Sequence, residues 1–434
     1  MFSQIPQSEI RNPQSERFLP MISDDQIRAA CDELEAEATA FLDRLIRFES
    51  MPGFEGPAMH WLHEQFQGLG DVVEFVPIPE EIRQDPEYQF TLSDRPYAER
   101  PNLRVTVKGS GGGRSLVLNA HADVVPPSVG QERPFDPVIR DGNIYGRGAV
   151  DDKGQVAAFW VILKAMKKLG LRPKGDVVFH IVIEEETGGN GTLAMVRATK
   201  EKFDFCINLE SCPGNIYTSM RGAVWFKATV WGRAAHSGSP QLAVNAIEMA
   251  IEAIRIMKEV REEILAETRN DDPILARLPN PMPLNLGEFH SGDYPSIAPR
   301  MATFSGVFGL LTTPNEEVRR RIEEAVRARG PEWLRDPEHF KIEFPYHHNI
   351  SRTDPNHPAV GIIKECFESI GVHAEVMGLS ASSDACFYTN FMGTPTVMTG
   401  LGNDTAHQIT EHITLRNVVL ESAMVVRFIR EWCG

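Results

Sequence analysis

Residues 177–189, "VVFHIVIEEETGG", join a β-rich apolar run to three consecutive acids. Seven residues without polar alternation are typical of a strand that is covered on both faces. Carboxylates at the end of such a strand repel one another, and burying even one without a partner is costly. We therefore expect a positive partner at residues 184–186, a segment that itself contains no Lys or Arg.

Similar short apolar runs surround this stretch, and helical patterns separate them. The runs are "LRVTV" (103–107), "SLVLNA" (115–120) and "FCINL" (205–209), and the clearest helix is "QVAAFWVILKAMKKLG" (155–170). Two further helices are expected earlier in the chain, one over residues 23–48 with a capping box at Ser23 and Gln26, and one over residues 58–69. This order predicts a doubly wound α/β domain with a mostly parallel sheet and helices on both faces.

The pattern changes after Gly214. A more regularly alternating strand (223–232) precedes a long helix (242–267), a strand (302–311), a helix (314–330) and a strand (340–346). Strand–helix–strand–strand–helix–strand is the order of a ferredoxin-like α+β unit. The α/β pattern returns from about residue 351, with helices over 357–371 and from Leu415. We expect a catalytic domain in two parts (1–215 and 350–434), interrupted by a satellite domain (216–349).

Composition restricts the function. The net charge of −16 argues against a nucleic-acid or anionic-membrane binder, and no run of about 20 apolar residues predicts a spanning helix. The six cysteines are scattered without a C-x-x-C pair, which favours free thiols in a reducing compartment. The first 25 residues form a polar arm with no apolar core of a signal peptide, so a cytoplasmic enzyme is expected.

Acids and histidines recur where strands end or loops turn. Each has a structural alternative, such as an N-cap for Asp151 or a core role for His121, but together they would meet at one edge of the sheet. Their nitrogen and oxygen donors suit Zn²⁺, Co²⁺ or Mn²⁺, and their number exceeds what one ion needs. Two ions about 3.5–4 Å apart, bridged by one carboxylate, would use them all. The candidates are His121, Asp151, Glu185 or Glu186, Glu210 and His407.

In order and spacing these residues resemble the co-catalytic zinc amidohydrolase and peptidase family, which includes acetylornithine deacetylase, succinyl-diaminopimelate desuccinylase, glutamate carboxypeptidase and aminoacylase. The resemblance rests on H-x-D (121–123), "GRGAVDDKG" (146–154), E-E-x-G (185–188), a strand-end Glu210 and a late His407, and it extends from about Phe41 to the C-terminus.

The resemblance implies a role for each residue of the centre. His121 and Glu210 would bind one metal, His407 would bind the other, Asp151 would bridge them, and Glu186 would be a further metal ligand. Asp123 would orient His121, and Glu185 would be the general base. Glu184 is left without a ligand role.

In the loop "GRAAHSGSP" (232–240), His236 corresponds to the family histidine that often reaches the partner subunit's active site and stabilises the oxyanion. The resemblance therefore also implies a homodimer formed through the satellite domain.

The chain departs from the family at the positions that usually hold a substrate carboxylate. Val307 and Gly309 occupy the place of an Asp-x-Arg pair, and Cys386 stands where an Arg is common. Both usual carboxylate clamps are therefore expected to be absent, which widens the range of acyl amides that could be substrates. Substrate contacts are expected instead from Arg221, Asn245, Arg300, Ser383 and Asp384.

The sequence thus predicts a two-metal hydrolase of small N-acyl amines or N-acyl amino acids that is acetylornithine deacetylase-like, with zinc as the first choice of metal. Two alternatives stay open. The same chemistry would serve a deformylase of an aminomethyl heterocycle, a desuccinylase or a dipeptidase. A non-catalytic metal-binding scaffold would be expected to lack the base or a ligand, and this chain has both.

Overall fold

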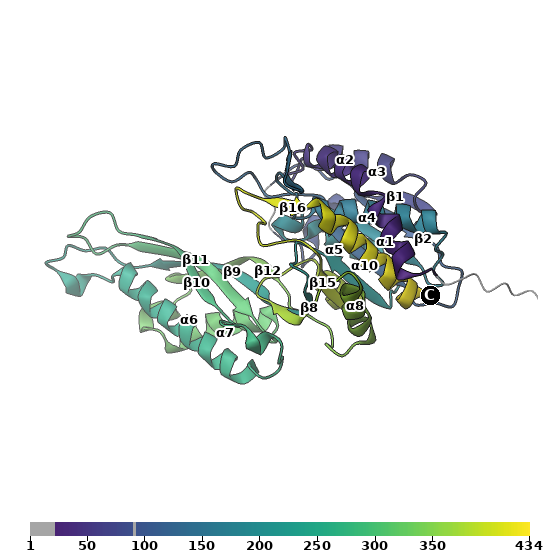
Figure 1. Ribbon diagram of the computed structural model, residues 1–434. Helices are drawn as coiled ribbons and strands as arrows, with labels where there is room; N and C mark the ends of the chain where they lie inside the picture. The colour runs from purple at the N-terminus through teal and green to yellow at the C-terminus, as the bar shows by residue number, and fades with distance from the viewer. Residues whose placement is uncertain (1–21, 90–92) are drawn as a thin grey trace, which may run out of the picture.

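The structure is a computed structural model that describes residues 22–89 and 93–434, so most of the expected N-terminal arm lies outside the described residues. Figure 1 shows a large α/β domain from which a smaller domain projects. The large domain is built on a nine-stranded sheet of order β1-β2-β6-β3-β7-β15-β8-β13, with β14 also paired to β8. Its strands are β1 (Val72–Val76), β2 (Asn102–Val107), β3 (Leu116–His121), β6 (Val177–Val182), β7 (Phe205–Leu209), β8 (Ile216–Met220), β13 (Ser351–Arg352), β14 (Val376–Leu379) and β15 (Thr396–Thr399).

The centre of this sheet is parallel: β3 pairs with β6 and β7, and β15 with β7. Every residue of β6 is buried. Phe179 contacts Phe159 of helix α4, whereas the next residue, His180, contacts Tyr388 from the other side of the sheet. Because neighbouring residues of a strand point to opposite faces, both faces of β6 are covered, as its apolar sequence predicts.

One layer of helices consists of α1 (Asp24–Asp32), α2 (Glu35–Ile46), α4 (Lys153–Leu169) and α10 (Leu415–Cys433), which contact one another (Figure 1). The remaining helices of this domain are α3 (Gly56–Phe66), α5 (Asn190–Ala198), α8 (Pro358–Ser369) and the short α9 (Ala385–Phe387). A small sheet of β4 (Val138–Arg140), β5 (Asn143–Tyr145) and β16 (His412–Thr414) lies beside them.

Two of the expected helix boundaries were wrong. The capping box at Ser23 is present, but the single helix expected over 23–48 is divided at Glu33 and Leu34, where no Gly or Pro signals a break. The division lets α1 and α2 each pack against both α4 and α10. Helix α3 ends at Phe66, before the expected Leu69, because Gly68 already adopts a positive φ of 73°.

The satellite domain is a four-stranded antiparallel sheet of order β10-β11-β9-β12. Its strands β9 (Gly222–Trp231), β10 (Leu284–Ser291), β11 (Met301–Leu310) and β12 (Phe340–His348) alternate with α6 (Ala246–Thr268) and α7 (Asn315–Arg329) in the predicted ferredoxin-like order. Figure 1 shows α6 and α7 together on one side of the sheet.

The chain passes between the two domains twice, at neighbouring points. Strand β8 belongs to the large sheet and pairs antiparallel with β13, with Met220 opposite Ser351. We therefore propose domain junctions near residues 221 and 350; the first lies a few residues after the expected start of the satellite domain at 216, and the second coincides with its expected end at 349. Within 22–89 and 93–434, no helix combines the length and apolarity needed to cross a bilayer.

Candidate metal centre

Five of the expected ligands come together at the carboxyl ends of the central strands. His121 is the last residue of β3, Glu210 follows β7, and Glu186 lies in the one-turn helix after β6. Asp151 precedes α4, and His407 lies in the loop between β15 and β16. Parallel neighbours of a sheet end at the same edge, so strands that are far apart in sequence deliver these side chains to one place.

Asp151 lies between two groups of donors. Its Oδ1 is 3.0 Å from Nε2 of His121, and Oε1 of Glu210 is 4.0 Å from the same nitrogen. Its Oδ2 is 3.3 Å from Nε2 of His407, and that same nitrogen is 3.0 Å from Oε2 of Glu186. Within each group the donor atoms lie within 4.8 Å of one another. One carboxylate therefore turns a different oxygen to each of two clusters.

Asp123 lies beside the centre and positions its residues through hydrogen bonds. Its two carboxylate oxygens accept the backbone N–H groups of Glu185 and Glu186, each at 3.1 Å. Nδ1 of His121 lies 3.1 Å from the Asp123 carbonyl oxygen and 3.4 Å from Oδ1. If Nδ1 carries the proton, Nε2 faces Asp151 with an unprotonated lone pair that can bind a metal ion. Asp123 thus fixes both the histidine and the turn that carries the two glutamates.

Glu184, for which no ligand role was expected, has a protein cation, Arg100, as its partner. Its carboxylate accepts hydrogen bonds from Arg100 (2.9 Å), Tyr97 (2.7 Å) and Asn190 (3.1 Å). Arg100 also binds the buried Glu55. Arg100 precedes β2 in a polar loop, so nothing in the local sequence indicates this contact.

The electrostatics of the cluster require positive charge. Burial raises the pKa of Glu210 to about 8, although His121 opposes this, and burial together with Asp151 raises that of Glu186. Hydrogen bonds to Asp151 and Glu186 raise the pKa of His407 to about 10. Burial lowers the pKa of His121, but hydrogen bonds to Asp123 and Asp151 outweigh it and raise the value. Such crowded acids ionise together only beside cations.

The donor set fits divalent metal ions. Two imidazole nitrogens and three carboxylates provide mixed N/O ligation, and the six cysteines are buried and free of disulfides. His407 is the exposed edge of the cluster, with 52% of its side chain accessible, so small molecules can approach from that side.

Glu185 lies beside the two groups without belonging to either. Its backbone is fixed by Asp123, and burial followed by the charge of Glu210 raises the pKa of its carboxyl. A half-buried carboxyl with a raised pKa next to a group of candidate metal ligands has the properties of a proton acceptor.

The residues expected to contact substrate are dispersed. Asp384 is buried close to the centre: its Oδ2 accepts hydrogen bonds from Thr192 (2.5 Å) and Asn119 (3.2 Å), and burial raises its pKa to about 6. Ser383 is also buried, against Met220. Arg221 donates both terminal guanidinium nitrogens to backbone carbonyl oxygens of residues 280 and 380.

The other two, and His236, which was expected to stabilise the oxyanion, lie in the satellite domain, away from the cluster. Arg300 is exposed, and the side chain of Asn245 caps α6 by accepting the N–H of Ile247. His236 is exposed in the loop between β9 and α6, at the end of the sheet opposite the domain junction. Its Nδ1 accepts the N–H of Gly238 at 3.0 Å, which assigns the ring proton to Nε2 and leaves a free donor.

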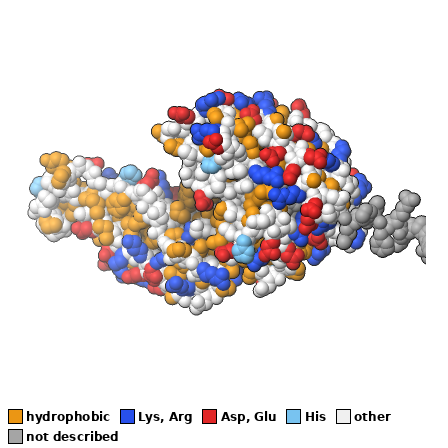
Figure 2. Space-filling model, viewed as in Figure 1, with side chains coloured by type: hydrophobic (Ala, Val, Ile, Leu, Met, Phe, Trp, Pro, Cys, Tyr) orange, Lys and Arg blue, Asp and Glu red, His pale blue; other side chains and the backbone are white. Residues whose placement is uncertain are grey.

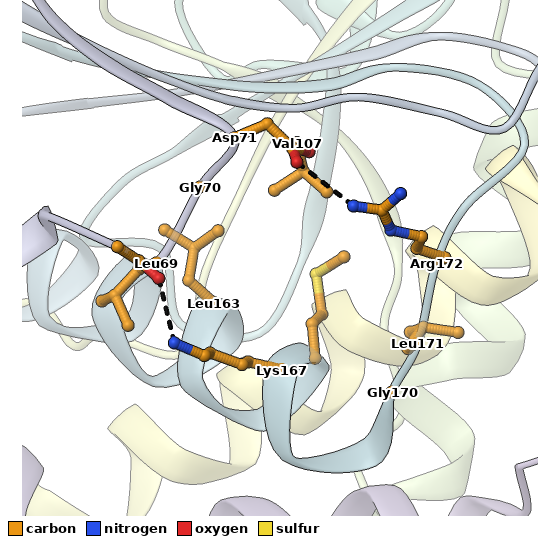
Figure 3. A pocket seen from close by; sticks show the side chains of 11 residues that line it. Leu69, Gly70, Asp71, Val107, Leu163, Lys167, Gly170, Leu171 and Arg172 are labelled. Carbon is orange, nitrogen blue, oxygen red and sulfur yellow. Dashed lines mark hydrogen bonds and ion pairs between the residues drawn. The ribbon is translucent and has the colours of Figure 1, made fainter.

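A separate cavity of about 320 Å³ lies at the C-terminal end of α4 (Figure 3). Its cations are already engaged: Lys167 donates to the Gly68 carbonyl oxygen, and Arg172 pairs with Asp71. This cavity is remote from the strand ends that carry the cluster and contains none of its residues.

Comparison with known proteins places this geometry in context. Residues 117–431 match peptidase family M20/M25/M40. The chain is 25% identical over 366 residues to N-formyl-4-amino-5-aminomethyl-2-methylpyrimidine deformylase of Halalkalibacterium halodurans, covering 78% of this chain and 84% of the relative. It is 27% identical over 332 residues to succinyl-diaminopimelate desuccinylase of Delftia acidovorans, covering 73% and 81%. The crystal structure of aminopeptidase PepT from Bacillus cereus has the same fold, with a TM-score of 0.71, 20% identity, and coverage of 92% and 99%.

Proposed function

The chain belongs to peptidase family M20/M25/M40 and is a metal-dependent hydrolase of amide or peptide bonds, and from this premise we propose that it removes the acyl group of a small N-acyl amine or N-acyl amino acid. The observation that carries the proposal is the position of Asp151 between two donor groups. In this proposal His121 and Glu210 hold one divalent ion, Glu186 and His407 hold the other, and Asp151 bridges them.

We propose zinc for both positions, because imidazole and carboxylate donors without thiolate suit Zn²⁺, with Co²⁺ and Mn²⁺ as possible replacements. When bound, such a pair of ions lowers the pKa of water and polarises an amide carbonyl.

The protein's own groups carry the remaining steps. Glu185 accepts the proton of the attacking water on a carboxylate oxygen and transfers it to the nitrogen of the leaving amine. Asp123 keeps Glu185 in place through its backbone N–H, and Arg100 and Tyr97 hold the preceding Glu184.

We further propose that the enzyme is a cytoplasmic homodimer. His236 carries a free Nε2–H on an exposed loop far from the cluster of its own subunit. That donor would stabilise the oxyanion only in the centre of a second copy, through satellite-domain contacts. The six buried free cysteines suit a reducing compartment.

The substrate is proposed as a class. Acetylornithine deacetylase-like activity is one member of it, and the deformylase and desuccinylase relatives define two others. The engaged nitrogens of Arg221 and the presence of Gly309 and Cys386 at the expected clamp positions favour an amide without an essential carboxylate. That favours the N-formyl or aminomethyl-heterocycle alternative over an N-succinyl amino acid.

Three glutamine variants test the assignment. Glu185→Gln should keep the metal content of the wild type and lose turnover by at least about 100-fold, because only the base is removed. Glu186→Gln should lose metal as well as turnover. Glu201→Gln, at an exposed ion pair on the surface, should change neither. The assay is elemental analysis together with hydrolysis of N-acetyl, N-formyl, N-succinyl and dipeptide substrates, and undiminished turnover by Glu185→Gln would refute the role of the base.

A further inference from the structure

A row of aromatic rings crosses the junction between the two domains. Trp225 of β9 lies directly opposite Tyr346 of β12, and their ring centroids are 4.8 Å apart. Tyr346 stacks in turn on His348 at 5.3 Å, and His348 meets the edge of Phe387 at 5.6 Å. The row therefore begins on the satellite sheet and ends inside the large domain.

The inner part of this row touches the turn that carries Glu185. Gly188 ends that turn, and its carbonyl oxygen accepts a hydrogen bond from Nε2 of His348 at 3.0 Å. A Cβ placed on Gly188 would lie 3.2 Å from Cε2 of Tyr346. Tyr346 is also close enough for the charge of Glu185 to help raise its pKa, after burial. The aromatic row and the proposed base are thus in the same place.

The outer part of the row is open. Trp225 is 46% exposed, on the face of the sheet that α6 and α7 leave free. Val307 of β11 pairs with Trp225 in register and also points to this open face, so an apolar side chain borders the indole. Figure 2 shows a notch where the satellite domain meets the large domain, with hydrophobic side chains along the satellite domain up to it.

We propose that Trp225 and Tyr346 form a subsite for a planar aromatic or heteroaromatic group of the amide substrate. An exposed indole beside a second ring offers a flat apolar face, and rings bind such faces by offset stacking. Val307 extends the apolar surface, and the nearby Arg221 has its terminal nitrogens on backbone carbonyls, so the subsite favours a neutral ring over a carboxylate. This inference rests on the proposed amide hydrolysis and specifies its substrate class.

The test uses four amides on the metal-loaded enzyme. N-acetylbenzylamine and N-acetyl-cyclohexylmethylamine place an aromatic or a saturated ring on the amine side, and N-methylbenzamide and N-methylcyclohexanecarboxamide place it on the acyl side. The wild type should prefer the aromatic member of at least one pair by roughly 10-fold in kcat/KM, since stacking interactions are of that size. Trp225→Ala should abolish this preference by lowering kcat/KM for the aromatic substrate. Its kcat/KM for the saturated substrate should stay within about two-fold of the wild type. Trp225→Phe should restore most of it.

Phe75→Ala is the matched control. Phe75 is also a half-buried stacked ring, 4.2 Å from His63, but it lies on β1 at the other edge of the large sheet. It should leave the aromatic preference unchanged. Equal loss for aromatic and saturated substrates in Trp225→Ala, or a change of its oligomeric state, would overturn the subsite and assign the indole to packing.

Calorimetry separates the two proposals. Glu185→Gln binds substrate without converting it, so titration with N-acetylbenzylamine and its saturated partner measures the subsite without turnover. Tighter binding of the aromatic amide that disappears in Glu185→Gln/Trp225→Ala supports the subsite. This holds even if none of the four amides is hydrolysed, because that outcome would count against the proposed function alone. Hydrolysis of the panel without any aromatic preference would overturn the subsite and leave the proposed function standing.

Discussion

Replacing Arg100 by Gln should destabilise the fold far more than the loss of an exposed ion pair. The guanidinium of Arg100 is only 4% accessible, and its Nη1 lies 2.9 Å from Glu55 and 2.9 Å from Glu184, whose side chains are fully buried. The substitution removes the positive charge of Arg100, which pairs with both carboxylates, and leaves Glu55 and Glu184 without that partner. Glu184 begins the turn that carries the proposed base and a proposed metal ligand, so the effect should reach the centre.

The size of the effect follows from burial. Removing one partner of a buried ion pair typically costs about 3–5 kcal/mol, because the remaining charge stays desolvated. Here two carboxylates lose the same partner, although protonation can relieve part of the penalty, so we expect about 4 kcal/mol. The control is Arg172→Gln, whose pair with Asp71 has side chains that are 70% and 32% accessible. An exposed pair of this kind contributes at most about 1 kcal/mol.

Urea unfolding monitored by circular dichroism measures the two variants, and elemental analysis follows the metal content. Adding Glu55→Gln to Arg100→Gln should recover part of the stability, since one of the two stranded charges is then absent. If Arg100→Gln proved no more destabilising than Arg172→Gln, or if the double variant recovered nothing, the electrostatic reasoning would be wrong.

Three further outcomes can be measured directly. Burial raises the pKa of Glu421 to about 8 from an ordinary 4.5, so the folded state binds the proton more tightly than the unfolded state, and its stability should fall as pH rises between those values. Glu421→Gln should therefore raise the thermal unfolding midpoint at pH 9 and not at pH 5, and an equal shift at both would contradict this. Chelation of the metal should lower the midpoint by several degrees, reversibly on adding Zn²⁺, because ligands that bind only the folded state stabilise it; an unchanged midpoint would count against metal binding at the cluster. Gly188→Ala should lose both stability and turnover in thermal and kinetic assays, because Gly188 has a φ of 119° and its new Cβ would lie 2.4 Å from Cβ of Gln89; wild-type behaviour would show that the turn can shift.

Much of the architecture could be predicted because apolar pattern and secondary structure have the same cause. The runs at β3, β6 and β7 are mostly apolar and buried at every position because the sheet is covered on both faces there, and such runs also show where strands end. Since parallel strands end at one edge, the convergence of His121, Glu210 and the 184–186 turn could be expected before any coordinates.

Other features depend on contacts between distant segments. The bend at Glu33 and Leu34 follows from packing against α4 and α10, and no residue there disfavours a continuous helix. Arg100 meets Glu184 across 84 positions of sequence. Asn245 was expected to contact substrate, yet its side-chain oxygen caps α6, a role that helix-start statistics already favour for Asn.

The two neighbouring crossings at Met220 and Ser351 make the satellite domain an exchangeable cassette. All the proposed metal ligands and the proposed base lie outside it, whereas Trp225, Tyr346 and His236 lie within it. On the proposed roles of these residues, replacing the cassette at its two adjacent junctions should alter substrate preference and self-association together, while the proposed metal ligands and base stay unchanged. Under these proposals, the reaction and its selectivity would be encoded by separate stretches of the gene.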